Sequence, residues 1–161
     1  MEFNILAILV AAISALVVGF VWYNPKVFGN AWMQAADMTE EKIKSGNMAK
    51  IFVLALLFAF LLSASLQMLV IHQTGAYSMI GGTVTDETLP SFQAFMDDYG
   101  TAFRTFKHGA LHGVLAGIFI ALPIIGTNAL FERKSAKYIL INSGYWIVTL
   151  AIMGGIICGW V

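Results

Sequence analysis

The chain has 161 residues, of which 59% are hydrophobic and only 11% are charged, and its formal net charge is zero. Soluble domains carry about 25% charged residues, so this composition excludes an ordinary soluble domain. The neutral charge balance gives no reason to expect nucleic acid as a partner. The single cysteine, Cys158, excludes a disulfide within the chain.

Four long segments free of Asp, Glu, Lys and Arg explain this composition. They cover residues 3–23, 51–71, 109–131 and 138–161. Each is long enough for a helix to cross the hydrocarbon core of a bilayer, which needs about 20 apolar residues. We therefore expect an all-α membrane protein with a single transmembrane domain over residues 1–161. Its four transmembrane helices should form a tight bundle with short interfacial helices.

The first connection between spans should hold two short interfacial helices. Asn24 is a typical N-cap residue and Pro25 suits the first helical position, so a helix should begin there. Phe28 and Trp32 would then face the membrane together. Thr39, which two glutamates follow, should cap a second short helix.

The long connection over residues 72–107 carries two different patterns. Residues 75–89 contain paired glycines and indicate an irregular loop. From Pro90 onward, aromatic residues recur at helical spacing, which predicts an amphipathic arm on the outer membrane surface. Gly100 could interrupt this arm before the third span begins.

Small residues recur at four-residue spacing in all four spans, and such residues let helix backbones approach closely in a membrane. We expect these ladders to hold the bundle together, with one of them free for a second copy of the chain. Pro123 should kink the third helix by removing a hydrogen bond to the carbonyl of Phe119. The ladders consist of Ala7, Ala11, Ala15 and Gly19; Ala55, Ala59 and Ser63; Gly109, Gly113, Gly117 and Ala121; and Ala151, Gly155 and Gly159.

The few basic residues are unevenly distributed. Seven of the nine lie in the first and third connections, and only Arg104 and Lys107 lie in the second. The positive-inside rule therefore places the first and third connections in the cytoplasm. Both termini and the long second connection should face outward. The seven are Lys26, Lys42, Lys44, Lys50, Arg133, Lys134 and Lys137.

Two stretches resemble a known bacterial membrane family. "GFVWYNPKVFGNAWM" ends the first span, and "NALFERKSAKYILINSGYWIVTLAIMGGIICGW" covers residues 128–160. Both are similar to the hallmarks of the family called domain of unknown function 1761, and together they cover about a third of the chain. The resemblance implies a small multi-pass protein of the bacterial cytoplasmic (inner) membrane, and it implies no activity.

All three histidines of the chain should lie at the outer end of the bundle. His72 follows the second span, and His108 and His112 begin the third. An i, i+4 pair with a third imidazole from another helix suits Zn²⁺, Cu²⁺ or Ni²⁺, and Asp97 could add a carboxylate. The pattern therefore predicts a divalent-metal or proton site. The alternative is that these histidines are interfacial polar residues bonded to water or backbone carbonyls.

A second group of polar and aromatic residues lies at the expected cytoplasmic end. Tryptophan and tyrosine at this depth are typical of belt anchors. The alternative is a pocket for a lipid headgroup or a small amphiphile, because polar side chains within the bundle need partners. The group consists of Trp22, Tyr23, Asn24, Pro25, Trp32, Asn128, Glu132, Asn142, Tyr145 and Trp146.

The sequence leaves three interpretations of function. The first is a structural or ligand- and lipid-binding membrane protein that self-associates, with membrane lipids and a second copy of the chain as partners. The second is an oligomeric transporter or channel, although no charged residue lies within a span. The third is a metal-dependent enzyme that uses the histidines, although the chain has no Walker loop, no Ser/His/Asp set and no HExxH motif.

Overall fold

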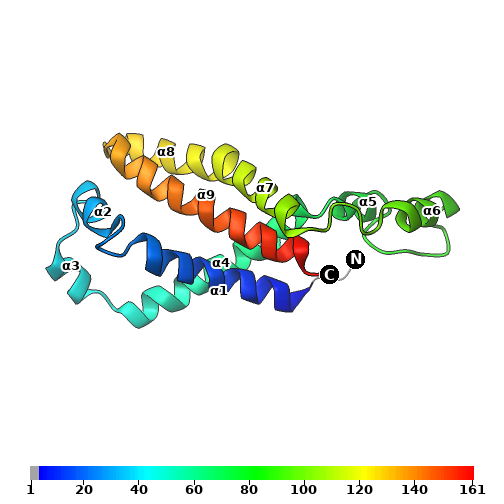
Figure 1. The fold of residues 1–161 in the computed structure, drawn as a ribbon, viewed down its shortest axis with the longest axis horizontal. Helices are drawn as coiled ribbons and strands as arrows, with labels where there is room; N and C mark the ends of the chain where they lie inside the picture. The colour runs from blue at the N-terminus through cyan, green and yellow to red at the C-terminus, as the bar shows by residue number, and fades with distance from the viewer. Residues whose placement is uncertain (1–3) are drawn as a thin grey trace.

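The computed structural model describes residues 4–161, and all regular structure within them is helical. The long helices are α1 (Ile5–Trp22), α4 (Met48–Val70), the segment formed by α7 (Phe106–Ala116), η1 (Gly117–Ala121) and α8 (Leu122–Phe131), and α9 (Ala136–Gly159). Each of the four is long and apolar enough to cross a membrane. They pack together as a bundle (Figure 1), which confirms the predicted fold class.

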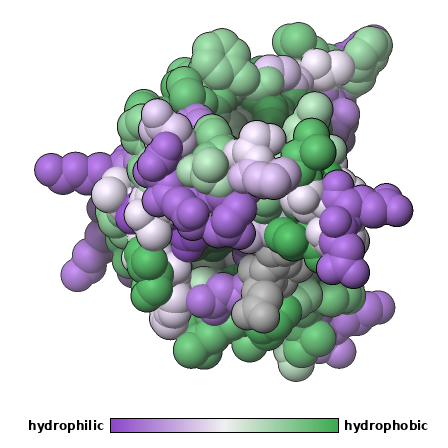
Figure 2. Space-filling view, turned by 90° about the vertical axis from the view of Figure 1, so that its right-hand side faces the viewer, coloured by the Kyte–Doolittle hydropathy of each residue, from purple (hydrophilic) through white to green (hydrophobic). Residues whose placement is uncertain are grey.

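The connections gather at two opposite ends of this bundle (Figure 1). We name the end that carries His72, His108 and His112 the histidine end; it also holds the C-terminus, the start of α1 and the helices α5 (Gln73–Met79) and α6 (Pro90–Tyr99). Seen from this end, hydrophilic residues lie over the middle of the molecule and project at its left and right sides, while hydrophobic residues lie mainly above and below them (Figure 2). The opposite, lysine-rich end carries α2 (Gly29–Ala35), α3 (Glu40–Ser45) and the α8–α9 turn.

Helix α9 lies at the centre of the bundle and contacts α1, α4, α7 and α8. Its side chains Leu150, Met153 and Ile157 are buried in the shared core. At its C-terminus, Arg104 donates from Nε to the carbonyl oxygen of Cys158 at 3.0 Å and from Nη2 to that of Trp160 at 2.8 Å. The guanidinium thus satisfies carbonyl groups that a helix end leaves without partners.

The glycine ladder of the third span forms the closest helix contact, between α7 and α9. A Cβ added at Gly113 would overlap the backbone of Leu150, and one added at Gly109 would overlap the backbone of Gly154. One turn further along, a Cβ at Gly117 would lie 2.6 Å from the Cα of Ile147. The expected backbone contact of these glycines is therefore confirmed.

Small residues also join α1 to α4. Ala7 and Ala11 on α1 and Ala59 on α4 are buried. Ser63 is fully buried as well, and its hydroxyl donates to the carbonyl oxygen of Ile8 at 2.9 Å. A small hydroxyl at this position lets the helices approach while it forms an interhelical hydrogen bond.

The first connection differs in part from its prediction. The helix expected at Asn24 and Pro25 begins only at Gly29, because Asn24 instead forms a tight turn. Its side-chain oxygen accepts from the backbone N–H of Lys26 at 2.9 Å, and its carbonyl accepts from that of Gly29 at 2.9 Å. The second helix is confirmed, with Thr39 accepting from the backbone N–H of Lys42 at 3.2 Å.

The third span is interrupted before Pro123. The wide π-helical turn η1 occupies Gly117–Ala121, and α8 continues directly from it, with Pro123 as its second residue. Phe119, whose carbonyl was predicted to lose its bond to the residue 123 backbone, lies within this π-helical turn.

The arm between α4 and α7 also departs from its prediction. Residues 75–79, expected to belong to an irregular loop, are part of α5, and α6 ends before Gly100 as anticipated. The Gln73 amide donates to the carbonyl oxygens of Tyr99 at 2.8 Å and Ala102 at 3.0 Å, which ties α5 to the end of α6. The pair extends outward along the long axis of the bundle instead of lying across its end (Figure 1).

Candidate three-histidine site

The ends of two long helices position the three imidazoles. His72 lies two residues beyond the end of α4, at the N-cap of α5, and His108 and His112 lie in the first and second turns of α7. The Thr105 hydroxyl starts α7 by accepting from the backbone N–H of His108 at 3.2 Å. Residues four apart share a helix face, so both α7 histidines point toward α4.

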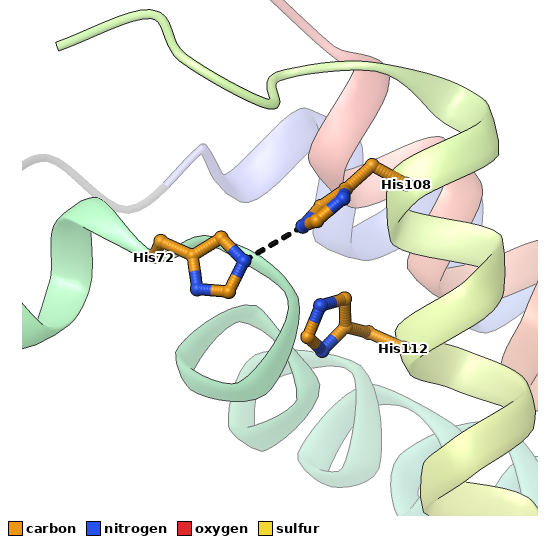
Figure 3. A group of neighbouring side chains, drawn as sticks. All are labelled: His72, His108 and His112. Carbon is orange, nitrogen blue, oxygen red and sulfur yellow. Dashed lines mark hydrogen bonds between the residues drawn. The ribbon is translucent and has the colours of Figure 1, made fainter. Parts of the chain in front are cut away.

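The structure brings the three rings together (Figure 3). The Nε2 atoms of His72 and His108 are 2.7 Å apart. The ring centroid of His112 lies 4.9 Å from that of His72 and 4.6 Å from that of His108. One nitrogen from each ring can be chosen so that all three lie within 4.8 Å of one another.

The site is open on one side and covered by an aromatic ring on another. His72 is exposed, while His108 and His112 are half-buried. The ring of Phe103 stacks on His108 with centroids 5.1 Å apart and meets His72 edge-on at 5.9 Å. Phe103 has a φ of 62°, and no sequence signal marks a phenylalanine for this left-handed conformation. Sequence reasoning therefore missed it.

Asp97, predicted as a fourth ligand, does not join the cluster. Its carboxylate is exposed on α6, where it accepts from Gln93 Nε2 at 2.7 Å. Among residues 4–161, no carboxylate oxygen lies with the three imidazole nitrogens. The chain turns between the end of α6 at Tyr99 and the start of α7 at Phe106, so Asp97 and His108 do not share one continuous helix face.

The geometry of the three nitrogens fits a metal ion. Zinc–imidazole bonds of about 2.0–2.1 Å at tetrahedral angles separate ligand nitrogens by about 3.3 Å. The observed separations, from 2.7 Å for one pair up to 4.8 Å, bracket this value, so small ring rotations would suffice. Without a metal, the 2.7 Å contact requires one imidazole to donate and the other to accept. The cluster can therefore hold either a shared proton or a cation.

Part of the second predicted group joins α1 to α9 by hydrogen bonds at the lysine-rich end. The Trp22 indole donates to the carbonyl oxygen of Ile141 at 3.0 Å, and the Tyr23 hydroxyl donates to Asn142 Oδ1 at 3.1 Å. The Tyr145 hydroxyl donates back to α1, to the carbonyl of Ala15 at 3.0 Å. These polar groups thus find partners within the bundle, as buried groups must.

The other members of that group take no part in these hydrogen bonds between α1 and α9. Asn128 and Glu132 are exposed on α8 and are not brought to this contact. Asn24 and Pro25 form the turn after α1. Phe28 and Trp32, expected to face the membrane together, instead pack on the last two aromatic residues of the first span: Trp32 on Tyr23 with ring centroids 5.3 Å apart, and Phe28 on Trp22 at 4.5 Å. Trp146 is half-buried beside Tyr145.

One ion pair links the two connections at this end. Lys134 Nζ lies 2.7 Å from Asp37 Oδ2. Its hydrogen bond holds the pKa of the Asp37 carboxyl below its usual value and raises the pKa of the Lys134 ammonium. The pair therefore holds α2 near the α8–α9 turn at neutral pH and is lost on strong acidification. Asp37 is well exposed and Lys134 is only partly buried, so solvent screens the pair and its stabilising effect is small.

Residues 6–158 match the family described as "Protein of unknown function (DUF1761)". The chain belongs to DUF1761. No curated protein and no solved structure is significantly similar to it. The two stretches of this DUF1761 chain that carry the sequence resemblance meet in space, because Trp22 and Tyr23 bond to Ile141 and Asn142. The three histidines lie outside both stretches.

Proposed function

We propose that this membrane protein binds one divalent transition-metal ion at the histidine end of its bundle. The observation that supports the proposal is the convergence of all three histidines of the chain, within 4.8 Å, from two separate helix ends. Neutral imidazole is a preferred ligand of Zn²⁺, Cu²⁺ and Ni²⁺. Three protein ligands with an exposed side leave a coordination position for water or a small ligand.

Such an ion would also act as a tether between α4 and α7. His72 follows α4, and the other two ligands belong to α7. A ligand that binds only the folded state stabilises it, by about 2.7 kcal/mol at a concentration 100 times the dissociation constant. Metal binding should therefore raise thermal stability as well as produce a binding signal. A metal-dependent enzyme would use the same three ligands, with the open position for its substrate.

Titration of the purified protein with Zn²⁺, Cu²⁺ or Ni²⁺ tests this proposal. The protein should carry an affinity tag without histidine and be treated first with a chelator. We expect one ion per chain by elemental analysis, and a higher melting temperature with metal. His72→Ala, His108→Ala and His112→Ala should each weaken binding at least about tenfold, because each removes a direct ligand.

Asp97→Asn provides the matched control, since the structure places this carboxylate away from the imidazoles. Its affinity should equal that of the wild type. Binding that is unaffected by all three alanine substitutions, or no binding at micromolar metal, would contradict a metal site. A pH-dependent change of stability without metal binding would favour the proton site instead.

We further propose that the histidine end faces outward across the bacterial inner membrane. Seven of the nine basic residues belong to the lysine-rich end, which the positive-inside rule places in the cytoplasm. A reporter active only in the periplasm should therefore be active when fused after Val161. The same reporter inserted beside Lys42 should be inactive, and the reverse pattern would overturn this orientation.

A further inference from the structure

A concave apolar cleft lies near the lysine-rich end of the bundle, away from the histidines. Helices α1 and α4 touch where Ser63 bonds to Ile8, and they diverge toward the lysine-rich end (Figure 1). The cleft between them has a volume of about 520 Å³. Helices α1 and α4 form its two walls, which include Phe20, Phe52 and Ala55. Helix α9 adds Tyr145 and Trp146 to its lining.

The lining indicates what kind of group fits there. Its two hydroxyls belong to Tyr23 and Tyr145, and both already donate within the protein, to Asn142 and to the Ala15 carbonyl. The remaining walls are alkyl and aromatic groups, and Phe20 and Phe52 are exposed. The cleft therefore offers apolar contact from three helices and no free hydroxyl donor, which suits a hydrocarbon chain.

Two lysines lie close in the sequence to residues that line this apolar cleft. Lys50 immediately precedes the lining residue Ile51, and Lys26 follows the lining residue Tyr23 by three positions. Both lysines are exposed, and among the described residues neither forms an ion pair. The two connections at this end together hold seven basic and four acidic residues. A negative group beside the cleft is thus electrostatically favoured, as for anionic lipid headgroups near clustered lysines.

We propose that this cleft is a specific site for one anionic phospholipid, with an acyl chain between α1 and α4 and the phosphate beside Lys26 and Lys50. A second crevice, of about 420 Å³ between α4 and the η1–α8 segment, provides an internal comparison. Its lining includes Ala121 and Leu150 and no charged side chain, and no lysine adjoins it. Ordinary lipid can fill that crevice without headgroup selection.

Native mass spectrometry tests the site on the whole protein in detergent, with equimolar dioleoylphosphatidylglycerol and dioleoylphosphatidylcholine. The acyl chains are identical, so a preference reports the headgroup. We expect one phosphatidylglycerol to be retained, with a preference of roughly 20-fold, since each lysine contributes about fivefold. The double variant Lys26→Gln/Lys50→Gln should lose this preference. Lys137→Gln, at the same end but with no lining residue of the cleft near it in the sequence, should keep most of it.

The cleft itself is tested by filling it. Ala55→Phe should abolish retention of both lipids, and Ala121→Phe, which fills the second crevice, should not affect phosphatidylglycerol. If Ala55→Phe lowers the melting temperature strongly, loss of lipid could reflect unfolding. The headgroup preference of the lysine variants then tests the proposal by itself. Equal retention of the two lipids by the wild type, or a preference that survives the double lysine variant, overturns the proposal. So does a lipid-free dimer that Ala55→Phe converts to monomer, because a second copy then covers the cleft.

Discussion

Replacing Gly113 by alanine should lower the stability of the bundle in detergent by about 1–3 kcal/mol, the usual cost of overpacking a filled interior. The added Cβ would overlap the backbone carbonyl of Leu150, and a backbone cannot move aside as a flexible side chain can. Helices α7 and α9 would have to separate along their whole contact. The gain in helix propensity of about 1 kcal/mol from Gly to Ala offsets only part of this cost.

Gly126→Ala is the matched control, because it makes the same chemical change in α8 of the same span. A Cβ there meets only Ile139 Cγ2, at the ordinary distance of 3.8 Å. We expect its melting temperature to match or exceed that of the wild type. Leucine at Gly113 should be more damaging than alanine, since more volume must be accommodated. Equal thermal unfolding of Gly113→Ala and Gly126→Ala would show that the α7–α9 contact does not limit stability.

Replacing Gln67 by leucine should have the opposite effect and raise stability by about 1–3 kcal/mol, the usual cost of a buried polar atom without a partner. The Gln67 side chain on α4 is only 2% exposed, and its Oε1 accepts no hydrogen bond among the described residues. Leucine has a similar volume and no polar atom. The substitution should therefore remove an unfavourable group without opening a cavity.

Ser63→Ala, one turn away on α4, is the comparison for Gln67→Leu. Ser63 is equally buried, but its hydroxyl donates to the Ile8 carbonyl, so its loss should cost about 0.6 kcal/mol, a typical interhelical bond in a membrane. The two substitutions should thus shift the melting temperature in opposite directions. A destabilised Gln67→Leu variant would indicate that a bound water or ligand satisfies Oε1.

Hydropathy was sufficient to predict the four spans, because a helix that crosses a bilayer needs a long apolar run whatever its neighbours are. Local chemistry likewise predicted the helix start at Thr39, where a side-chain hydroxyl caps the backbone three residues later. The same local reasoning failed at Asn24 and in residues 75–79. There, a tight turn to Gly29 and the bonds from Gln73 to the end of α6 decided the backbone.

The sequence by itself determined that three histidines share one end of an all-helical bundle, because connectivity fixes which end each helix terminus reaches. It also determined that glycines would allow close contact in the third span. Only the tertiary structure decided that Gly113 meets Leu150, that His72 lies beside His108, and that Asp97 does not. Helix rotation and the turn after Gly100 set these pairings, and both depend on side-chain packing between segments far apart in the chain.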